Sequence, residues 1–468
     1  MNDELLRKFT RVSDVIWELP VSFKKGMLVP ARIYGTESIL KDMDDTVVEQ
    51  LTNVACLPGI QKHALCMADG HSGYGFPIGG VAAFDPEKGI ISPGGIGFDI
   101  NCGMRLLKTN LTVEEVQPKI KELVDLLFKM VPSGVGGQGF VTLNSAQMKD
   151  VMRLGAKWCV GRGYGTEHDL EHIEENGVIP GADPSKVTQK ALGRGIHQLG
   201  TLGSGNHYLE IQAVRKGEIF DKAAAKEMGI KEGQICVMVH CGSRGFGHQI
   251  ASDYLGIFTE AMKKHKITVK DPELACAPFT SPEGQDYFKA MACAANMAFA
   301  NRQVIVHQIR EAFRHVFKDA KLETVYDVAH NIAKLETHLV GGKKKELLVH
   351  RKGATRCFKG QPVIIGGSME TGSYLLVGTE KSGETFGSTM HGAGRTMSRT
   401  KAKAAISGKK LQKDMEKRGI YVKTGSFSGL AEEAGFAYKD VSEVAKAMDI
   451  AGISKPVAAL RPIGNIKG

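Results

Sequence analysis

The stretch from Gly94 to Arg105 constrains the fold more than any other part of the chain, because it places four glycines around an acid and a thiol. Glycine permits tight turns and lets other groups approach the backbone closely. Asp99 and Cys102 lie three residues apart here and could therefore face one small volume. A carboxylate beside a thiolate suits a divalent transition ion better than calcium or magnesium. A glycine-rich turn with a buried cysteine is the simpler interpretation of this stretch alone.

Three histidines, His207, His240 and His330, recur beside glycines or at the ends of apolar segments. Strand ends are where α/β proteins usually place their chemistry. Together with Asp99 and Cys102 these histidines make five ligands, more than one tetrahedral ion needs. The set therefore predicts two ions that share the thiolate, and manganese and zinc both fit it. Each histidine taken alone is equally compatible with an ordinary hydrogen-bonded polar residue.

A fourth histidine, His391, lies in a polar stretch with small residues after it and with Arg395 and Arg399 within eight positions. Small residues let a phosphate approach backbone amides, and arginine grips phosphate oxygens in a fixed fork. A histidine held there could attack a phosphorus atom and carry a covalent intermediate. A helix start after a polar loop is the alternative. The chain lacks both the P-loop motif and the lysine-x-aspartate-glycine motif of lysine-nucleophile ligases, so any nucleotide site is an unusual one.

Periodic patterns indicate alternating helices and strands along the whole chain. We expect helices at about 112–127, 145–160, 285–317, 400–417 and 440–449, and strands at about 234–239, 324–329, 363–365 and 374–377. Residues 1–50 are expected to form irregular strands and turns at the edge of the core. With no repeat, linker or composition break, the chain is predicted to form one compact domain, residues 1–468. Its class is mixed α/β (α+β), with central β-sheets flanked by helices.

Three glycine-rich or charged stretches are predicted as loops or solvated surface. Residues 68–80 form the first, in which Asp69 and His71 are candidate polar site residues. Residues 133–139 form a second, mobile glycine stretch. His168 and His172 have a spacing that can bind a metal, but the acids around them favour a solvated helix face.

Composition places the chain among globular proteins, with 42% hydrophobic and 24% charged residues. Lysine and arginine outnumber the acids 61 to 51, and the formal charge of +10 is compatible with a polyanionic partner. Nine cysteines without any Cys-x-x-Cys pair favour a reducing compartment. The first residues lack a signal-peptide pattern, and no apolar run approaches the ~18 residues that span a bilayer. We therefore expect a cytoplasmic protein that does not contact a membrane.

On these residues the sequence resembles the RtcB family of RNA-splicing ligases over nearly its whole length. The segments that carry the resemblance are Asp69–Gly80, Gly94–Arg105, Leu199–Glu210, His240–Gly247, Tyr326–Ala333, Gly366–Val377, His391–Arg399 and Tyr438 to Gly468. The resemblance implies an RtcB-like fold and a ligase that joins an RNA 3′-phosphate or 2′,3′-cyclic phosphate to a 5′-hydroxyl. It also implies GTP and two Mn²⁺ ions as cofactors, a role in tRNA splicing or RNA repair, and an archease-like activating protein as a partner.

By motif position, the resemblance assigns a role to each candidate site residue. Cys102 would bridge the two manganese ions, with Asp99 and His207 completing one and His240 and His330 the other. His391 would be the catalytic nucleophile that takes GMP from GTP. The nucleotide would contact Asn206, His207, Tyr208, Leu209, Glu210, His330, Asn331, Gly366, Gly367, Ser368, Met369, Ser373, His391, Gly392, Ala393, Gly394 and Lys467. Candidates for the RNA backbone are Arg194, Arg244, Arg351, Arg356, Arg395 and Arg399.

Two positions depart from the family pattern. Glu370 ends Gly366-Gly-Ser-Met-Glu370 where the family commonly has Pro-Gly-Ser-Met-Gly, and Gly435 stands where a proline is usual. The carboxylate could weaken GTP binding or point away to a basic partner, and the glycine could loosen the approach to Tyr438. Two other functions compete with the ligase: a binuclear metal hydrolase of phosphodiesters, and a basic RNA-binding protein with a structural metal.

Overall fold

Two large sheets form the framework of the computed structural model, which describes residues 1–134 and 136–468. In this described part, a seven-stranded sheet has the order β1 (Thr10–Ser13), β2 (Ile16–Leu19), β3 (Ala31–Tyr34), β4 (Ile60–His71), β5 (Ile78–Phe84), β13 (Lys343–Lys352) and β12 (Asn331–Val340). The second large sheet has eight strands. Seven of them have the order β11 (Leu322–Ala329), β7 (Gly103–Thr112), β9 (Gln234–Cys241), β8 (Tyr208–Ala213), β19 (Ser454–Lys467), β16 (Ser373–Gly378) and β15 (Pro362–Ile365). The eighth, β18 (Tyr421–Thr424), also pairs with β19. Short ladders join β6 (Ile90–Ile91) to β10 (Ala277–Pro278), and β14 (Ala354–Arg356) to β17 (Ser388–Met390).

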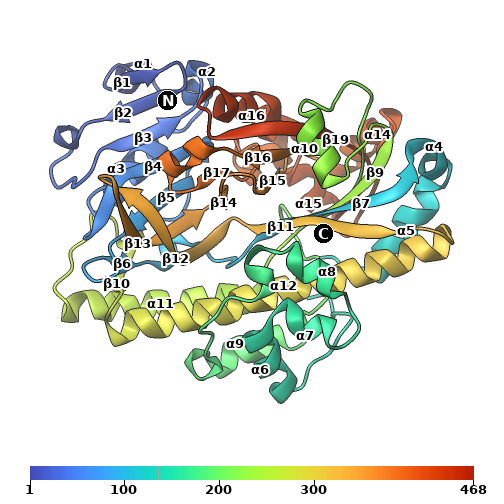
Figure 1. The fold of residues 1–468 in the computed structure, drawn as a ribbon, viewed down its shortest axis with the longest axis horizontal. Coiled ribbons are helices and arrows are strands. Elements are labelled where there is room, and N and C mark those ends of the chain that lie inside the picture. Colours follow the sequence, from blue (N-terminus) through green and yellow to red (C-terminus); the bar gives the residue numbers. More distant parts are fainter. Residues whose placement is uncertain (135) are drawn as a thin grey trace.

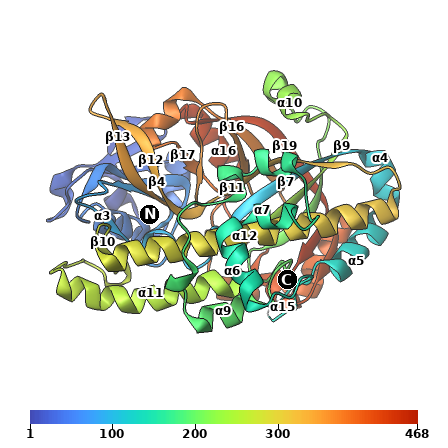
Figure 2. The ribbon, with the colours of Figure 1, turned by 60° about the horizontal axis from the view of Figure 1, so that its bottom comes forward.

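The long helix α12 (Pro282–Val316) confirms the buried helix predicted for residues 285–317. Its middle is rich in alanine and almost wholly buried, because small side chains let neighbouring elements pack closely against it. Figure 1 shows α12 and α11 (Arg244–Lys264) running side by side along one side of the sheets. Three shorter helices pack against this pair (Figure 2): α6 (Ser145–Leu154), α7 (Ala156–Val160) and α9 (Gln189–Gly195).

The remaining helices pack against the sheets or against one another. They are α1 (Asp3–Leu6), α2 (Glu37–Lys41), α3 (Asp45–Val54), α4 (Val113–Val116), α5 (Ile120–Met130), α8 (Glu167–Glu171), α10 (Lys222–Met228), α13 (Arg399–Ala405), α14 (Gly408–Lys417), α15 (Phe427–Glu432) and α16 (Val441–Ile450). The mixed α/β class, with sheets flanked by helices, is thus confirmed. None of the helices in the described residues is long and apolar enough to cross a membrane.

Three predicted helices are divided where the backbone requires it. The helix predicted at 112–127 begins with the expected capping box of Thr112 and Glu115, but a 3-10 turn containing Pro118 separates α4 from α5. Gly155, with a left-handed φ of +51°, separates α6 from α7. Ser407 starts a new helix within 400–417, because its side chain accepts a hydrogen bond from the first turn of α14.

The two ends of the chain are more regular than the sequence predicted. Three strands from residues 1–50 join the seven-stranded sheet. The prediction of a loop over 68–80 is correct only for residues 72–77, because β4 continues through Asp69 to His71 and β5 begins at Ile78. At the other end, β19 lies inside the eight-stranded sheet, paired with β8, β16 and β18. The predicted glycine stretch 133–139 includes Val135, which lies outside the described residues.

Candidate active site

The loop that carries Asp99 and Cys102 is held in place by α12. Asn101, between them, has a left-handed φ of +53°, which asparagine tolerates better than most residues. Arg302 on α12 donates to the backbone carbonyl oxygen of Asn101 at 2.8 Å, and the side-chain amide of Asn101 donates to Ala295 O at 2.7 Å. The two ligand candidates therefore project from a rigid support.

Four neighbouring strands bring the other ligand candidates to the same edge of the eight-stranded sheet. Cys102 directly precedes β7, His207 directly precedes β8, and His330 directly follows β11. His240, near the end of β9, lies opposite Tyr208 on one side and Met104 on the other. Segments far apart in sequence thus converge because antiparallel neighbours alternate direction and these ends meet.

Each of the five predicted ligand side chains contacts at least one of the others. Cys102 Sγ lies 3.4 Å from His207 Nε2 and 3.2 Å from His240 Nε2. Asp99 Oδ2 lies 2.8 Å from His207 Nε2, and His240 Nε2 lies 3.3 Å from His330 Nε2. The contacts run from Asp99 through His207, Cys102 and His240 to His330, so the cysteine lies at the centre of one connected cluster, and the division into two ion sites stays a prediction.

Hydrogen bonds and burial make this donor set suitable for a divalent transition ion. His240 Nδ1 lies 3.1 Å from Asn206 O, and a carbonyl can only accept, so the lone pair of His240 lies on Nε2 and faces Cys102. His207 allows either tautomer, since its Nδ1 lies near both a carbonyl and Arg244. Burial raises the pKa of the Cys102 thiol to about 11, so a bound cation is what would hold it as a thiolate at neutral pH.

A second pair of side chains, His391 and Asp69, stands beside this cluster. His391 follows β17 and Asp69 lies on β4. One oxygen of the fully buried Asp69, Oδ2, accepts from His391 Nδ1 at 2.5 Å, from the His391 backbone amide at 2.8 Å and from Gly392 N at 3.2 Å. Nδ1 is thereby occupied, and Nε2 is left as the free nitrogen of His391. The rings of His391 and His330 lie 4.9 Å apart between centroids.

A cavity of about 780 Å³ joins the cluster, the His391 side chain and most of the predicted nucleotide contacts. Predicted residues that line it are Asp99, Cys102, Asn206, Tyr208, His240, His330, Asn331, Gly366, Gly367, Ser368, Met369, His391, Gly392, Ala393, Gly394 and Lys467. His207 reaches the site through Asp99 and Cys102. Leu209 packs into a hydrophobic core cluster, and Ser373 is buried beside Gln212. Lys352 and Glu433 also line the cavity, and no local sequence pattern pointed to them.

Two buried charged residues, Glu210 and Lys467, lie near Tyr208, and of these Lys467 lines the cavity. Burial raises the pKa of Glu210 to about 7, although it accepts hydrogen bonds of 2.7 Å from both Gln212 and Asn465. Burial lowers the pKa of Lys467, whose Nζ lies 5.4 Å from the centre of the Tyr208 ring and 3.9 Å from Glu433. Lys467 therefore offers a buried hydrogen-bond donor at this end of the cavity.

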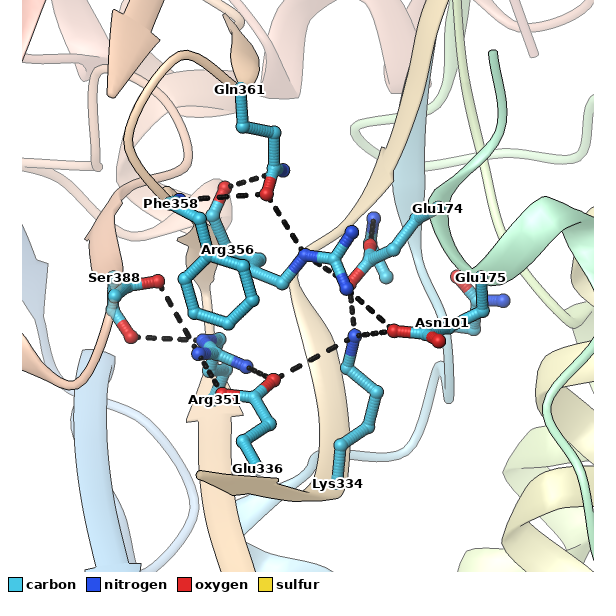
Figure 3. Close-up of polar contacts among 12 residues, drawn as sticks. Asn101, Glu174, Glu175, Lys334, Glu336, Arg351, Arg356, Phe358, Gln361 and Ser388 are labelled. Carbon is cyan, nitrogen blue, oxygen red and sulfur yellow. Dashed lines mark hydrogen bonds and ion pairs between the residues drawn. The ribbon is translucent and has the colours of Figure 1, made fainter. Parts of the chain in front are cut away.

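Two of the arginines predicted for the RNA backbone, Arg351 and Arg356, are held in ion pairs inside the protein. Arg351 is fully buried and forks onto Glu336 with two bonds of 2.7 Å (Figure 3). Arg356 is held by Glu175 at 2.5 Å and by the Tyr326 hydroxyl. The prediction is therefore wrong for these two, because their charges are already neutralised inside the protein. For Arg194, Arg244, Arg395 and Arg399 it stays a prediction.

The network in Figure 3 also fixes the end of β11. Lys334 points between Glu174 and Glu175, and pairs with both. The other oxygen of Glu174 accepts from the backbone amide of Ala329 at 2.8 Å. Because Ala329 directly precedes His330, this buried charge network supports the position of a ligand candidate.

Glu370 points away from the cavity. Its Oε1 accepts from the Gly435 backbone amide at 2.7 Å, and its Oε2 pairs with Arg418. The two departures from the family pattern are thus in contact: a proline at 435 would have no N–H to donate to the carboxylate.

Taken together, the site combines a candidate transition-metal centre with His391, whose Nε2 is not held by Asp69. A nucleophile beside a metal-ligand set is typical of an enzyme. The family model described as tRNA-splicing ligase RtcB matches residues 50–468. A tRNA-splicing ligase RtcB of Thermococcus kodakarensis is 54% identical, with 98% of each chain covered. Proteins of the same description from Archaeoglobus fulgidus, with each chain covered completely, and from Methanococcus maripaludis, with 98% and 99% covered, are both 52% identical. The chain belongs to the RtcB family.

Proposed function

We propose that this chain joins an RNA 3′-phosphate or 2′,3′-cyclic phosphate to an RNA 5′-hydroxyl, with GTP and manganese, through a GMP adduct on His391. Membership of the RtcB family makes the chain an RNA ligase, and the names of its relatives point to tRNA splicing. The observation that carries the finer proposal is the His391–Asp69 pair beside the cysteine–histidine cluster.

In the first step, His391 Nε2 attacks the α-phosphorus of GTP. The new bond joins nitrogen to phosphorus, and pyrophosphate leaves. Asp69 Oδ2 accepts a hydrogen bond from Nδ1–H, which stays on the ring. This bond orients the imidazole and stabilises the positive charge that it gains. The same oxygen fixes the backbone on either side of the ring, so His391 is positioned before GTP arrives.

In the following steps, GMP passes from His391 to the RNA 3′-phosphate, and the 5′-hydroxyl attacks the activated phosphorus as GMP leaves. Asp99, Cys102 and His207 would hold one manganese ion, and Cys102, His240 and His330 the other. When bound, the ions would withdraw charge from the phosphates and supply an activated water to open a cyclic phosphate. Lys467, which lines the cavity beside Tyr208, would face the guanine, and Glu210, buried two residues further along β8, stays a predicted nucleotide contact.

Residues 1–468 would act as one functional domain, since both large sheets supply site residues. It includes a cytoplasmic location, which the nine free cysteines support, and activation by an archease-like protein. A further role in RNA repair would need the same chemistry.

Incubation with manganese and GTP labelled on the α-phosphate tests the proposal. We expect the unaltered protein to retain an acid-labile, alkali-stable label, and His391→Ala to retain none. Asp69→Asn keeps the shape of the side chain but removes the charge that orients His391, so adduct formation should slow by roughly 10²- to 10⁴-fold.

The competing hydrolase predicts the opposite pattern. An unaltered protein that takes up no label but cleaves phosphodiesters would exclude the histidine adduct and assign the cluster to hydrolysis. Exposed His168→Ala is the matched control, because it removes an imidazole from the surface helix α8 and should label normally.

The contact between Glu370 and Gly435 makes a separate prediction. Gly435→Pro removes the donor to Glu370, so unfolding in urea should show a loss of about 1–3 kcal/mol. In the background Glu370→Gly the same proline should be much less destabilising, because no carboxylate is left without its partner. Equal effects of the proline in both backgrounds would show that the two positions are independent.

A further inference from the structure

The segment from Arg399 to Arg418, which contains α13 and α14, is the most basic part of the surface that adjoins the cavity. Its 20 residues include eight lysines and arginines and two acids, an excess of six. The formal charge of the whole chain is +10, so more than half of the excess lies in this short segment. A charge concentrated in this way indicates an anionic partner more strongly than net charge does.

Several of these cations are not neutralised by the protein itself. Lys403, Lys417 and Arg418 pair with acids. Among the residues that the structure describes, four exposed lysines form no ion pair: Lys401, Lys409, Lys410 and Lys413. Lys409 and Lys413 stand four residues apart on one side of α14, a spacing at which like charges destabilise a helix. Bound phosphates would relieve this repulsion.

Exposed aromatic rings lie among these lysines. Phe427, at the start of α15, is 42% exposed, and Phe436, in the 3-10 turn Gly435–Ala437, is 47% exposed. Helix α15 packs against both α13 and α14, and the turn packs against α13. Lys409 Nζ lies 5.7 Å from the centre of the Phe427 ring. Cations beside exposed rings are the combination by which proteins hold single-stranded nucleic acid.

The basic segment is continuous with the candidate active site. Met397, Ser398, Arg399 and Lys401 line the cavity that contains His391. The chain then leaves the cavity wall and forms the exposed faces of α13 and α14. A strand with its end at His391 would therefore meet this surface as it leaves the cavity.

We propose that α13, α14 and Phe427 form the path along which a single RNA strand leaves the active site. Lys401, Lys409, Lys410 and Lys413 contact its phosphates, and Phe427 and Phe436 stack on its unpaired bases. This inference rests on the proposed function, because it assigns the RNA of that reaction to one side of the cavity. An unpaired strand fits better than a duplex, whose bases are not available to stack on protein rings.

Binding of a fluorescein-labelled, single-stranded RNA with a 5′-hydroxyl, measured by anisotropy over a range of salt concentrations, tests the phosphate contacts. The triple variant Lys409→Gln, Lys410→Gln, Lys413→Gln should lower the slope of log K against log salt by about 2, since each phosphate contact contributes about 0.7 on a single strand. The matched control is Lys343→Gln, Lys344→Gln, Lys345→Gln, which removes the same charge from the exposed hairpin between β12 and β13. The control should keep the original slope.

Phe427 tests the stacking contact. Phe427→Ala should weaken RNA binding by roughly 5- to 100-fold, and Phe427→Trp should retain it, because stacking needs only an aromatic face. Phe220→Ala, which removes another exposed ring far along the sequence, should bind RNA normally. All these variants should form the GMP adduct like the unaltered protein, since none removes a residue of the GTP site.

Two results would overturn the inference. An equal loss of slope in both lysine triples would mean a general attraction of the whole surface for RNA. If the Lys409, Lys410 and Lys413 variant bound RNA normally but no longer bound polyglutamate, the surface would be assigned to an acidic protein instead. Absence of the GMP adduct in the unaltered protein counts against the proposed function alone, because the RNA slopes are measured without ligation.

Discussion

Cys102→Ala is expected to abolish high-affinity binding of manganese. Cys102 Sγ contacts both His207 and His240, so its loss removes a ligand from both halves of the cluster at once. Loss of a residue that only supports a ligand lowers metal affinity by about 10- to 100-fold, and loss of the ligand itself should lower it further. Equilibrium dialysis followed by metal analysis would measure the change in stoichiometry directly, whether or not the protein is active.

Cys236→Ala is the matched control for this experiment. Cys236 is also fully buried and lies on β9, the strand of His240, but its side chain belongs to a hydrophobic core cluster. The control should lose a little stability and keep its metal. If Cys102→Ala bound two ions as tightly as the unaltered protein, the shared thiolate would have to be abandoned.

Asp327→Asn is expected to destabilise the fold by about 3–5 kcal/mol, as removal of one partner from a buried ion pair does. Asp327 accepts from Arg105 at 2.6 Å and from Arg302 at 2.8 and 2.9 Å, and all three side chains are fully buried. Asparagine keeps the size but leaves two buried guanidinium groups without a counter-charge. Urea unfolding followed by circular dichroism would measure the loss.

Glu311→Gln provides the comparison for Asp327→Asn. Glu311 pairs with Arg314 at the surface, where both side chains are about half exposed, and such pairs contribute little. Its removal should change the free energy of unfolding by less than about 0.5 kcal/mol. An equally small effect of Asp327→Asn would mean that the buried arginines find other partners.

Strand ends and turns could be predicted because the sequence marks them locally. Glycines beside Cys102 and His207 separate apolar strands from polar ends, and these positions indeed meet at one sheet edge. Helix α12 was also predictable, because residues 285–317 are rich in alanine, methionine and glutamine and contain no proline. The proximity of the candidate ligands therefore followed from strand ends together with residue type.

Contacts between distant segments were beyond such reasoning. Asp69 and His391 are separated by 322 positions, and nothing near either residue indicates the other. Arg351 was expected to bind RNA because its partner, Glu336, is apparent only when β12 pairs with β13. β19 was missed because Pro456 and Pro462 interrupt the strand pattern, and shifts in its register accommodate them.

The charge network around Lys334 affects how the stability of the site changes with temperature. The penalty for removing ions from water falls as temperature rises, because ion hydration has a strongly unfavourable entropy. The contacts of Lys334 with Glu174 and Glu175 therefore become relatively more stabilising on heating. Glu174 also accepts a hydrogen bond from Ala329, the residue before His330. The position of the His330 imidazole is therefore supported by contacts that weaken little on heating.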